Sequence, residues 1–129
     1  MNDEIEESKD RLGSGRLVID NIADLSPNLA RSIDEWVMNG VWLEPGLTER
    51  ERRISTLSMV AALGVPAALD IHIPSALEAG FSEEEIVAIF HHVAVYAGIP
   101  RSLEATTHLK RILEQRASSS RGRGMRQWT

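Results

Sequence analysis

The stretch between residues 47 and 100 constrains the fold more than any other feature, because it contains the start and stop signals of three consecutive helices. Thr48 with Glu51, and Ser82 with Glu85, each match a capping box, in which a hydroxyl and a carboxylate bond free backbone N–H groups at a helix start. Glycine favours the left-handed conformation that ends a helix, and the expected stops are Gly64, Gly80 and Gly98. The pattern predicts helices at residues 49–63, 66–79 and 83–97.

The first and third of these helices are too apolar for surface helices. Their apolar residues are Ile54, Leu57, Met59, Val60, Ala61, Ala62 and Leu63, and Ile86, Val87, Ile89, Phe90, Val93, Ala94, Val95 and Ala97. A helix that is apolar nearly all round needs cover on all sides, and a chain of 129 residues has limited surface to supply that cover. We therefore expect other copies of the same chain to supply much of it, so that the protein is a homo-oligomer.

Composition narrows the class of protein. Frequent Ala and Leu with few aromatic residues favour helix over sheet. The chain has no cysteine, which excludes disulfides, thiolate catalysis, Cys-ligated zinc and iron–sulfur clusters. It has no apolar run long enough to span a membrane, and its acidic N-terminus does not resemble a secretory signal. We expect a cytoplasmic all-α protein without a membrane partner and, because the net charge is −5, without a nucleic-acid partner.

The two ends of the chain differ in composition from the middle. Residues 1–15 are polar and acidic and end in Gly-Ser-Gly, which predicts a flexible arm. An arm that crosses onto a neighbouring subunit is the alternative. Residues 118–129 contain arginines and no acid, which predicts a flexible basic tail, with contact to RNA or to the acidic arm as the alternative. The helical domain is expected at residues 16–117.

Further helix signals flank the central stretch. Residues 17–25 are expected to form a short helical turn. Ser26 followed by Pro27 marks a helix start, because proline loses no hydrogen bond at the first helical position, and Gly40 marks the end of that helix. A last amphipathic helix is expected from about residue 101 to residue 116.

Polar side chains inside the apolar helices are the candidates for chemistry, because burying an unpartnered polar group costs about 1–3 kcal/mol. His72 is the one side chain on its helix face that can change charge near neutral pH, although a lone histidine on an apolar face is more often structural. His92 and Tyr96 stand four residues apart and share a face of the third helix. They are candidates for catalysis, or for a structural pair at a helix or subunit contact.

Candidate binding residues lie at the start of the first central helix and in the turn before it. Arg52 precedes Thr56 by one turn, and its guanidinium suits a bidentate contact to a carboxylate. Arg53 competes for that role. The alternative is that Arg52 is an exposed arginine in a charged first turn and binds no ligand. Trp42 and Glu44 lie in a turn segment of the kind that often lines sites. The chain has no HExxH pattern, phosphate loop or nucleophile elbow, so no metal site is predicted.

A longer series of residues between Gly40 and Pro100 keeps the order and spacing of a known family without gaps. The matching positions are Trp42, Pro45-Gly46-Leu47-Thr48, Glu51-Arg52, Thr56-Leu57, Ala61-Ala62-Leu63-Gly64, Leu69, His72, Ala76-Leu77, Gly80, Glu84-Glu85-Ile86 and the run from His92 to Pro100. The series covers about half of the chain. It resembles the carboxymuconolactone decarboxylase family, within the alkylhydroperoxidase D-like fold.

The resemblance implies an all-α helical bundle that assembles as a trimer or a ring-shaped hexamer, with sites at subunit contacts. It implies a cofactor-free lyase that decarboxylates or isomerises a small anionic lactone or enone-type acid by proton transfer. In such a site Arg52 would anchor the anion and His72 would transfer the proton. His92 and Tyr96 would donate to an oxyanion or orient His72. The other expected binding residues are Trp42, as an apolar wall, Thr56 and Glu44.

One departure from the fold's peroxidase branch changes the expected chemistry. That branch carries a Glu, then a Cys-x-x-Cys, then a His four residues after the second Cys. Aligned on His72, this chain has Val65 and Ala68 at the cysteine positions and Arg53 at the Glu position. Thiol peroxidase activity is therefore excluded, and the site is more cationic than usual, which favours a different enolisable acid, lactone or polyketide-like substrate.

Two other functions are compatible with the same residues. One is a non-catalytic binding or scaffold protein that keeps the oligomer and a pocket. The other is a helical nucleic-acid binder that uses the arginine-containing tail, which is the weaker reading because its basic residues are confined to one end.

Overall fold

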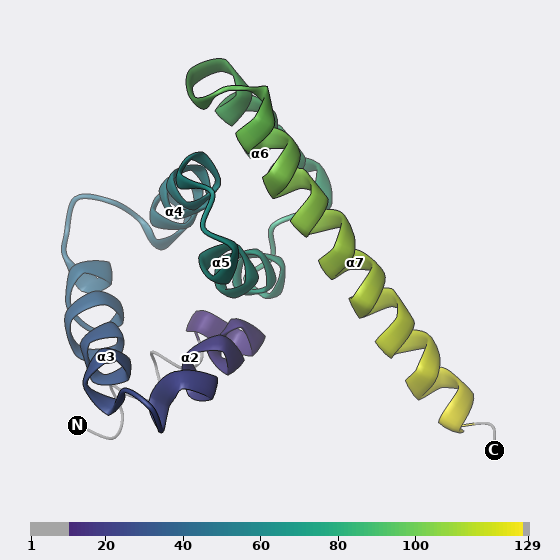
Figure 1. The fold of residues 1–129 in the computed structure, drawn as a ribbon, viewed down its shortest axis with the longest axis horizontal. Helices are drawn as coiled ribbons and strands as arrows, with labels where there is room; N and C mark the ends of the chain where they lie inside the picture. The colour runs from purple at the N-terminus through teal and green to yellow at the C-terminus, as the bar shows by residue number, and fades with distance from the viewer. Residues whose placement is uncertain (1–10, 128–129) are drawn as a thin grey trace.

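All regular structure in residues 11–127 is helical, which confirms the all-α prediction. The computed structural model describes these residues, with side chains for residues 11–122. The elements in chain order are η1 (Gly13–Gly15), α2 (Arg16–Ala23), α3 (Pro27–Ser32), η2 (Ile33–Met38), η3 (Val41–Leu43), α4 (Glu49–Leu63), α5 (Pro66–Glu78), α6 (Glu83–Ala97) and α7 (Ile99–Gln127). Figure 1 shows α4 and α5 between the N-terminal helices α2 and α3 on one side and α7 on the other.

The three central helices begin and end where the sequence signals place them, within one residue. Both capping boxes form: the backbone N–H of Glu51 donates to Thr48 Oγ1 at 3.1 Å, and that of Thr48 donates to Glu51 Oε1 at 2.8 Å. Ser82 and Glu85 make the same pair of bonds at the start of α6, at 3.1 and 3.0 Å. Gly64 ends α4 with φ +67°, in the left-handed region that favours glycine.

The helix expected between Pro27 and Gly40 is present but changes its winding part-way. Ser26 caps α3, as predicted, by accepting a bond from the Leu29 N–H. From Ile33 the chain continues as a π-helical segment, in which the N–H of Asn39 donates to the carbonyl of Asp34, five residues back, at 2.9 Å. Within it, Asp34 pairs with Arg16 of α2, whose Nη2 lies 2.7 Å from Asp34 Oδ2.

The last helix is longer than expected, so the sequence-based end at Arg116 is wrong. α7 begins at Ile99 and continues to Gln127. The residues after Arg116 are Ala and Ser, which do not stop a helix, and the first glycine beyond it is Gly122. Arg116 also lies 3.6 Å from Glu78 of α5, across the helix contact. The flexibility expected of the tail stays a prediction, and residues 1–10 of the expected acidic arm lie outside the described residues.

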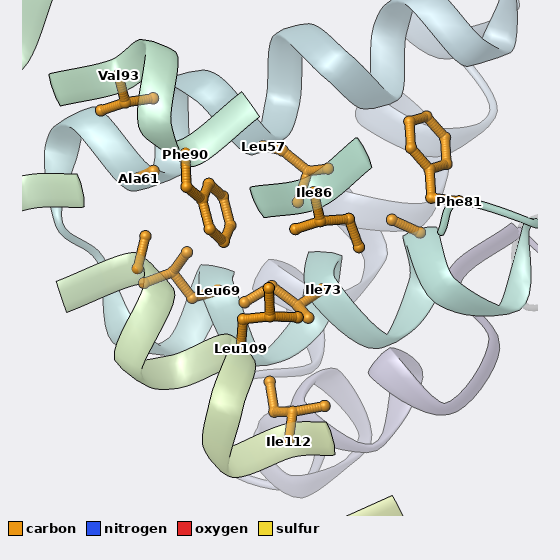
Figure 2. Packing of buried hydrophobic residues seen from close by; sticks show 12 residues of the cluster. Leu57, Ala61, Leu69, Ile73, Phe81, Ile86, Phe90, Val93, Leu109 and Ile112 are labelled. Atoms are coloured by element: carbon orange, nitrogen blue, oxygen red, sulfur yellow. The ribbon is translucent and has the colours of Figure 1, made fainter. Parts of the chain in front are cut away.

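The main core lies where α4, α5, α6 and α7 meet (Figure 2). Its buried residues are Leu57, Ala61, Leu69, Ile73, Ala76, Phe81, Ile86, Phe90, Val93, Ala105, Leu109 and Ile112. Each helix therefore contributes one apolar side to a common centre, which is the arrangement that a helix bundle needs.

A second, smaller apolar cluster attaches the N-terminal part of the chain to α5. Leu12, Ile19, Ala30 and Met38 form it, with Ile71 of α5 packed against them. Gly15 approaches α5 so closely that an added Cβ would lie 2.1 Å from the Ile71 carbonyl oxygen. This cluster holds η2 and η3 near α4 and α5, where the candidate site lies.

Replacing Phe90 with Ala should lower the free energy of unfolding by about 3–5 kcal/mol, because the ring is fully buried at the helix contact. Urea unfolding followed by circular dichroism measures the change. Leu25→Ala is the control, since Leu25 is 87% exposed and its truncation should change stability by less than about 0.5 kcal/mol. Equal losses in the two variants would contradict the position of the core.

Candidate active site

A pocket of about 330 Å³ lies between α4, α5 and the segment around η3. Its lining residues are Val37, Val41, Trp42, Leu47, Arg52, Ser55, Thr56, Met59 and His72. The structure thus brings together Trp42, Arg52, Thr56 and His72, which were separate candidates in the sequence. No acidic side chain is among the lining residues, so the pocket presents arginine and histidine to a ligand without a competing carboxylate.

His72 is the titratable group of this pocket. It projects from α5 and is partly buried. Burial, which disfavours the charged form, and the positive charge of Arg53 lower the pKa of His72 to about 4. The imidazole is therefore neutral near pH 7, with one nitrogen able to accept a proton and the other able to donate a hydrogen bond.

Arg52 borders the same pocket and holds the preceding turn in place. Its Nη2 donates to the backbone carbonyl of Glu44 at 2.7 Å. Its Nε is buried and finds no hydrogen-bond partner among the described residues. Glu44 thus contacts the site through its main chain, and its carboxylate is not among the pocket's lining groups.

The structure does not place His92 and Tyr96 in the His72 pocket. Their rings lie 5.3 Å apart and tilted by 59°, on an exposed side of α6. They line a separate pocket of about 250 Å³ with Ser58, Met59, Ala62, Val93 and Ala97. Met59 of α4 borders both pockets, so the two are neighbours.

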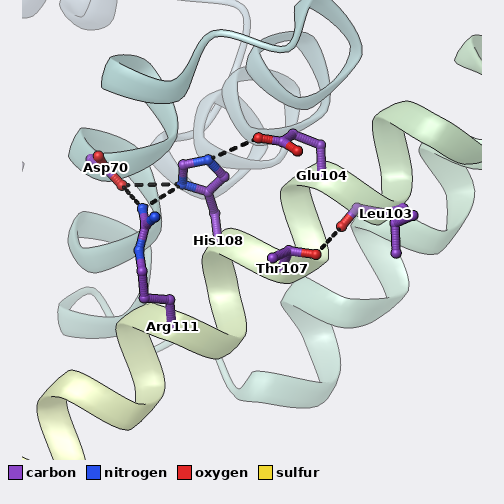
Figure 3. A network of polar contacts seen from close by, with 6 residues as sticks. All are labelled: Asp70, Leu103, Glu104, Thr107, His108 and Arg111. Atoms are coloured by element: carbon purple, nitrogen blue, oxygen red, sulfur yellow. Dashed lines mark hydrogen bonds and ion pairs between the residues drawn. The ribbon is translucent and has the colours of Figure 1, made fainter.

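A polar network centred on the buried His108 links α5 and α7 (Figure 3). It was not predicted from the sequence. His108 Nδ1 lies 3.3 Å from Asp70 Oδ1 and 2.8 Å from Arg111 Nη2, and its Nε2 lies 3.2 Å from Glu104 Oε1. The spacing of Glu104, His108 and Arg111, four and three residues apart, was the available signal. These contacts give both nitrogens of the buried His108 ring a polar partner, and they link α7 to α5, the helix that carries His72.

Comparison with known proteins identifies the family. Residues 27–111 match the carboxymuconolactone decarboxylase family. This range includes every residue that lines the His72 pocket. The chain belongs to the carboxymuconolactone decarboxylase family. The resemblance seen in the sequence is thereby confirmed.

Two characterised relatives are similar to this member of the carboxymuconolactone decarboxylase family. A 4-carboxymuconolactone decarboxylase of Acinetobacter baylyi is 28% identical over 91 residues, which cover 70% of this chain and 67% of the relative. Nitrosuccinic acid decarboxylase npaB of Metarhizium robertsii is 36% identical over 73 residues, which cover 57% of this chain and 51% of the relative. The chain thus spans about two thirds of the first relative and about half of the second.

In the part of the chain that the structure describes, no group of three His, Asp or Glu side chains is placed to hold a metal ion. Among the helices of that part, none combines the length and hydropathy of a membrane span.

The low pKa of His72 should make the fold less stable in mild acid. The pKa is about 4 in the folded chain against an ordinary value of 6.5, so between these pH values the unfolded chain binds a proton that the folded chain does not. The free energy of unfolding therefore rises with pH across this window and levels off above it, by at most about 3 kcal/mol. Urea unfolding at about pH 5 and about pH 7 measures the difference.

His72→Gln should remove most of this pH dependence, whereas His91→Gln, at an exposed position of α6, should leave it unchanged. The same pH slope in wild type and His72→Gln would contradict a neutral His72.

Proposed function

We propose that this chain is a cofactor-free decarboxylase of a small organic acid that carries an electron-accepting group. The observation that carries the proposal is the pairing of Arg52 with a neutral His72 in one pocket that no acidic side chain lines. The names of both relatives support it, since each describes an acid that also contains a lactone or a nitro group. Such groups can accept the electron pair that remains when CO₂ leaves.

Binding would begin with the substrate carboxylate at Arg52, whose guanidinium offers parallel N–H donors. Apolar side chains make up most of the remaining wall: Val37, Val41, Trp42, Leu47 and Met59. They would exclude water from the carboxylate, and a carboxylate that loses its hydration is destabilised relative to neutral CO₂. The pocket thus favours loss of the localised charge once the anion is bound.

Carbon–carbon cleavage would move the bonding electron pair into the lactone carbonyl or nitro group and release CO₂. The charge then lies on an oxygen, to which Arg52 and the hydroxyls of Ser55 and Thr56 can donate hydrogen bonds. His72, in its protonated form, would end the reaction by giving its proton to a carbon of the conjugated anion that remains. The imidazole then takes a replacement proton from solvent, so one proton is consumed for each CO₂ formed.

A bound anion would itself prepare His72 for this step. Burial and Arg53 both oppose protonation of the imidazole and so keep it neutral near pH 7. A carboxylate beside it adds the opposite charge and raises its pKa toward neutrality. Substrate binding should therefore be accompanied by proton uptake at His72.

We also propose that the chain forms the homo-oligomer expected from the sequence. Exposed apolar side chains of α6 and α7, Val95, Ile99 and Leu103, are 65–72% exposed and line one groove of about 550 Å³ with His91, Ala94, Ser102 and Thr106. Such a surface is costly to leave in water, and another copy of the chain in a trimer or hexamer would cover it. His92 and Tyr96, on the same exposed helix, would then lie at or near the contact, so we assign the proton transfer to His72.

A non-catalytic binding protein is the second candidate. The observation that favours it is Arg53, which occupies the position where the peroxidase branch of the fold has a Glu and is turned into the interior, only 6% exposed. The pocket of such a protein would hold an acid at Arg52 and release it unchanged.

Wild-type protein incubated with 4-carboxymuconolactone or nitrosuccinate should release CO₂, which can be followed as ¹³C-labelled bicarbonate by NMR. His72→Ala should lower the rate by roughly 10²–10⁴-fold, because a positioned general acid contributes that factor. Arg52→Gln should raise KM by roughly 10–100-fold, since it removes a charged hydrogen bond to the substrate. The control is Arg50→Gln, which replaces an exposed arginine of α4 that does not line the pocket, and it should change neither quantity.

Succinate, which has carboxylates but no electron-accepting group of this kind, should bind without reacting. An acid that raises Tm in the wild type but not in Arg52→Gln, with no CO₂ formed from any acid tested, would identify the binding protein instead. Full activity in His72→Ala would contradict the assigned proton donor.

A further inference from the structure

Arg53 is a buried arginine that does not line the pocket but contacts Trp42, which does. It is 6% exposed and lies on α4, next to Arg52 in the sequence. Its Nη2 donates to the backbone carbonyl of Arg11 at 2.8 Å. The carbon at the centre of its guanidinium lies 5.6 Å from the centroid of the Trp42 ring, within the range of a cation–π contact.

The charge of Arg53 is poorly compensated for a group so deeply buried. Its ion pair with Glu49 is long, at 3.7 Å, and the Glu49 side chain is 53% exposed, so water weakens the pair. Its Nε is buried and has no hydrogen-bond partner among the described residues. An apolar side chain of similar length would avoid the cost of removing this charge from water. Stability alone therefore does not explain an arginine at this position.

Two contacts connect Arg53 to the candidate site. Trp42, which lies under the guanidinium, is a lining residue of the His72 pocket. Arg11, whose carbonyl accepts the hydrogen bond, immediately precedes Leu12 of the N-terminal apolar cluster. The Arg11 side chain in turn donates to Asn39 Oδ1 at 3.2 Å, close to the chain that enters η3. One guanidinium thus joins α4 to Trp42 of the pocket wall and to the segment at Arg11, which does not line the pocket but holds the chain that enters η3.

The same guanidinium also acts on His72 through its charge. Arg53 is the charged neighbour that, together with burial, opposes protonation of the imidazole. Burial lowers the pKa of Arg53 as well, but an arginine stays charged at neutral pH. A lysine would be easier to deprotonate when buried, so arginine is the residue that keeps a permanent charge here.

We propose that Arg53 is a positioning residue, whose buried guanidinium fixes Trp42 of the pocket wall against the chain at Arg11 and places a permanent positive charge near His72. It differs from Arg52, which borders the pocket and can touch a ligand directly. The effect of Arg53 on turnover depends on the proposed decarboxylation, whereas its effects on the pocket wall and on His72 do not.

Two substitutions at this position separate the charge of Arg53 from its hydrogen bond. Arg53→Gln keeps an N–H donor for the Arg11 carbonyl but removes the charge, and Arg53→Lys keeps a charge but loses the planar guanidinium over Trp42. The readouts are the titration midpoint of the His72 imidazole and the indole N–H signal of Trp42, both followed by NMR in ¹⁵N-labelled protein.

In Arg53→Gln the His72 midpoint should rise by roughly 0.5–1 pH unit, because the neighbouring positive charge is lost while much of the burial remains. In Arg53→Lys the midpoint should stay within about 0.3 unit of the wild-type value, and the Trp42 signal should shift. With an acid that the wild type turns over, Arg53→Gln should change KM and displace the pH profile of kcat/KM in the same direction as the NMR midpoint.

Arg50→Gln provides a matched control, because Arg50 is also an arginine of α4 over an aromatic ring. Its guanidinium carbon lies 4.3 Å from the Phe81 centroid, and it pairs with Glu85, away from the lining residues of the His72 pocket. This variant should leave the His72 midpoint and the Trp42 signal unchanged.

Unchanged His72 and Trp42 signals in Arg53→Gln would overturn the proposal, and so would equal shifts in Arg53→Gln and Arg50→Gln. If Arg53→Gln does not fold, the Arg53→Lys variant still tests the contact with Trp42. An unshifted Trp42 indole signal in that variant would also overturn the proposal. Absence of turnover by the wild type would contradict the decarboxylase but not the NMR result, so the two failures are distinguishable.

Discussion

The packing of α5 between two apolar clusters is the constraint on which the candidate site depends. Leu69 and Ile73 face the main core, whereas Ile71 packs against the N-terminal cluster. Successive residues of a helix point about 100° apart, so His72 emerges on the flank between these two contacts. Neither cluster covers that flank completely, and the space left there is the pocket. The low pKa of His72 is therefore a consequence of packing on both sides of its helix.

The sequence predicted the central helices well because their boundaries depend on local chemistry. Thr48 and Ser82 cap the helices to which they belong, through bonds that span three residues. The end of α7 was predicted poorly for the same reason. Nothing local ends that helix at Arg116, and its contact with Glu78 involves a residue distant in the sequence. Helix periodicity also gave no indication that the turn after Ser32 widens into a π-helical segment.

The candidate site was only partly predictable, because a helix pattern shows which residues share a face but not what that face meets. The sequence singled out Trp42, Arg52, Thr56 and His72, and the structure brings these four together in one pocket, whereas their roles stay a prediction. It also suggested that His92 and Tyr96 orient His72, although they line a different pocket. For Arg52 and Arg53, neighbours about 100° apart on one helix, only the tertiary structure shows that the first borders the pocket and the second is buried behind it.

A site with positive charge and no carboxylate is suited to a reaction in which negative charge moves without disappearing. In the proposed decarboxylation the substrate arrives with its charge on a carboxylate and, after CO₂ leaves, holds it on a lactone or nitro oxygen. Interactions that are equally strong before and after this transfer do not accelerate it. The apolar wall around Trp42 makes the difference, because it penalises the localised charge of the carboxylate more than the delocalised charge that follows. Arg52 and Arg53 would then keep the anion bound while the wall drives the loss of CO₂, and the proton from His72 would remove the charge that holds the product in place.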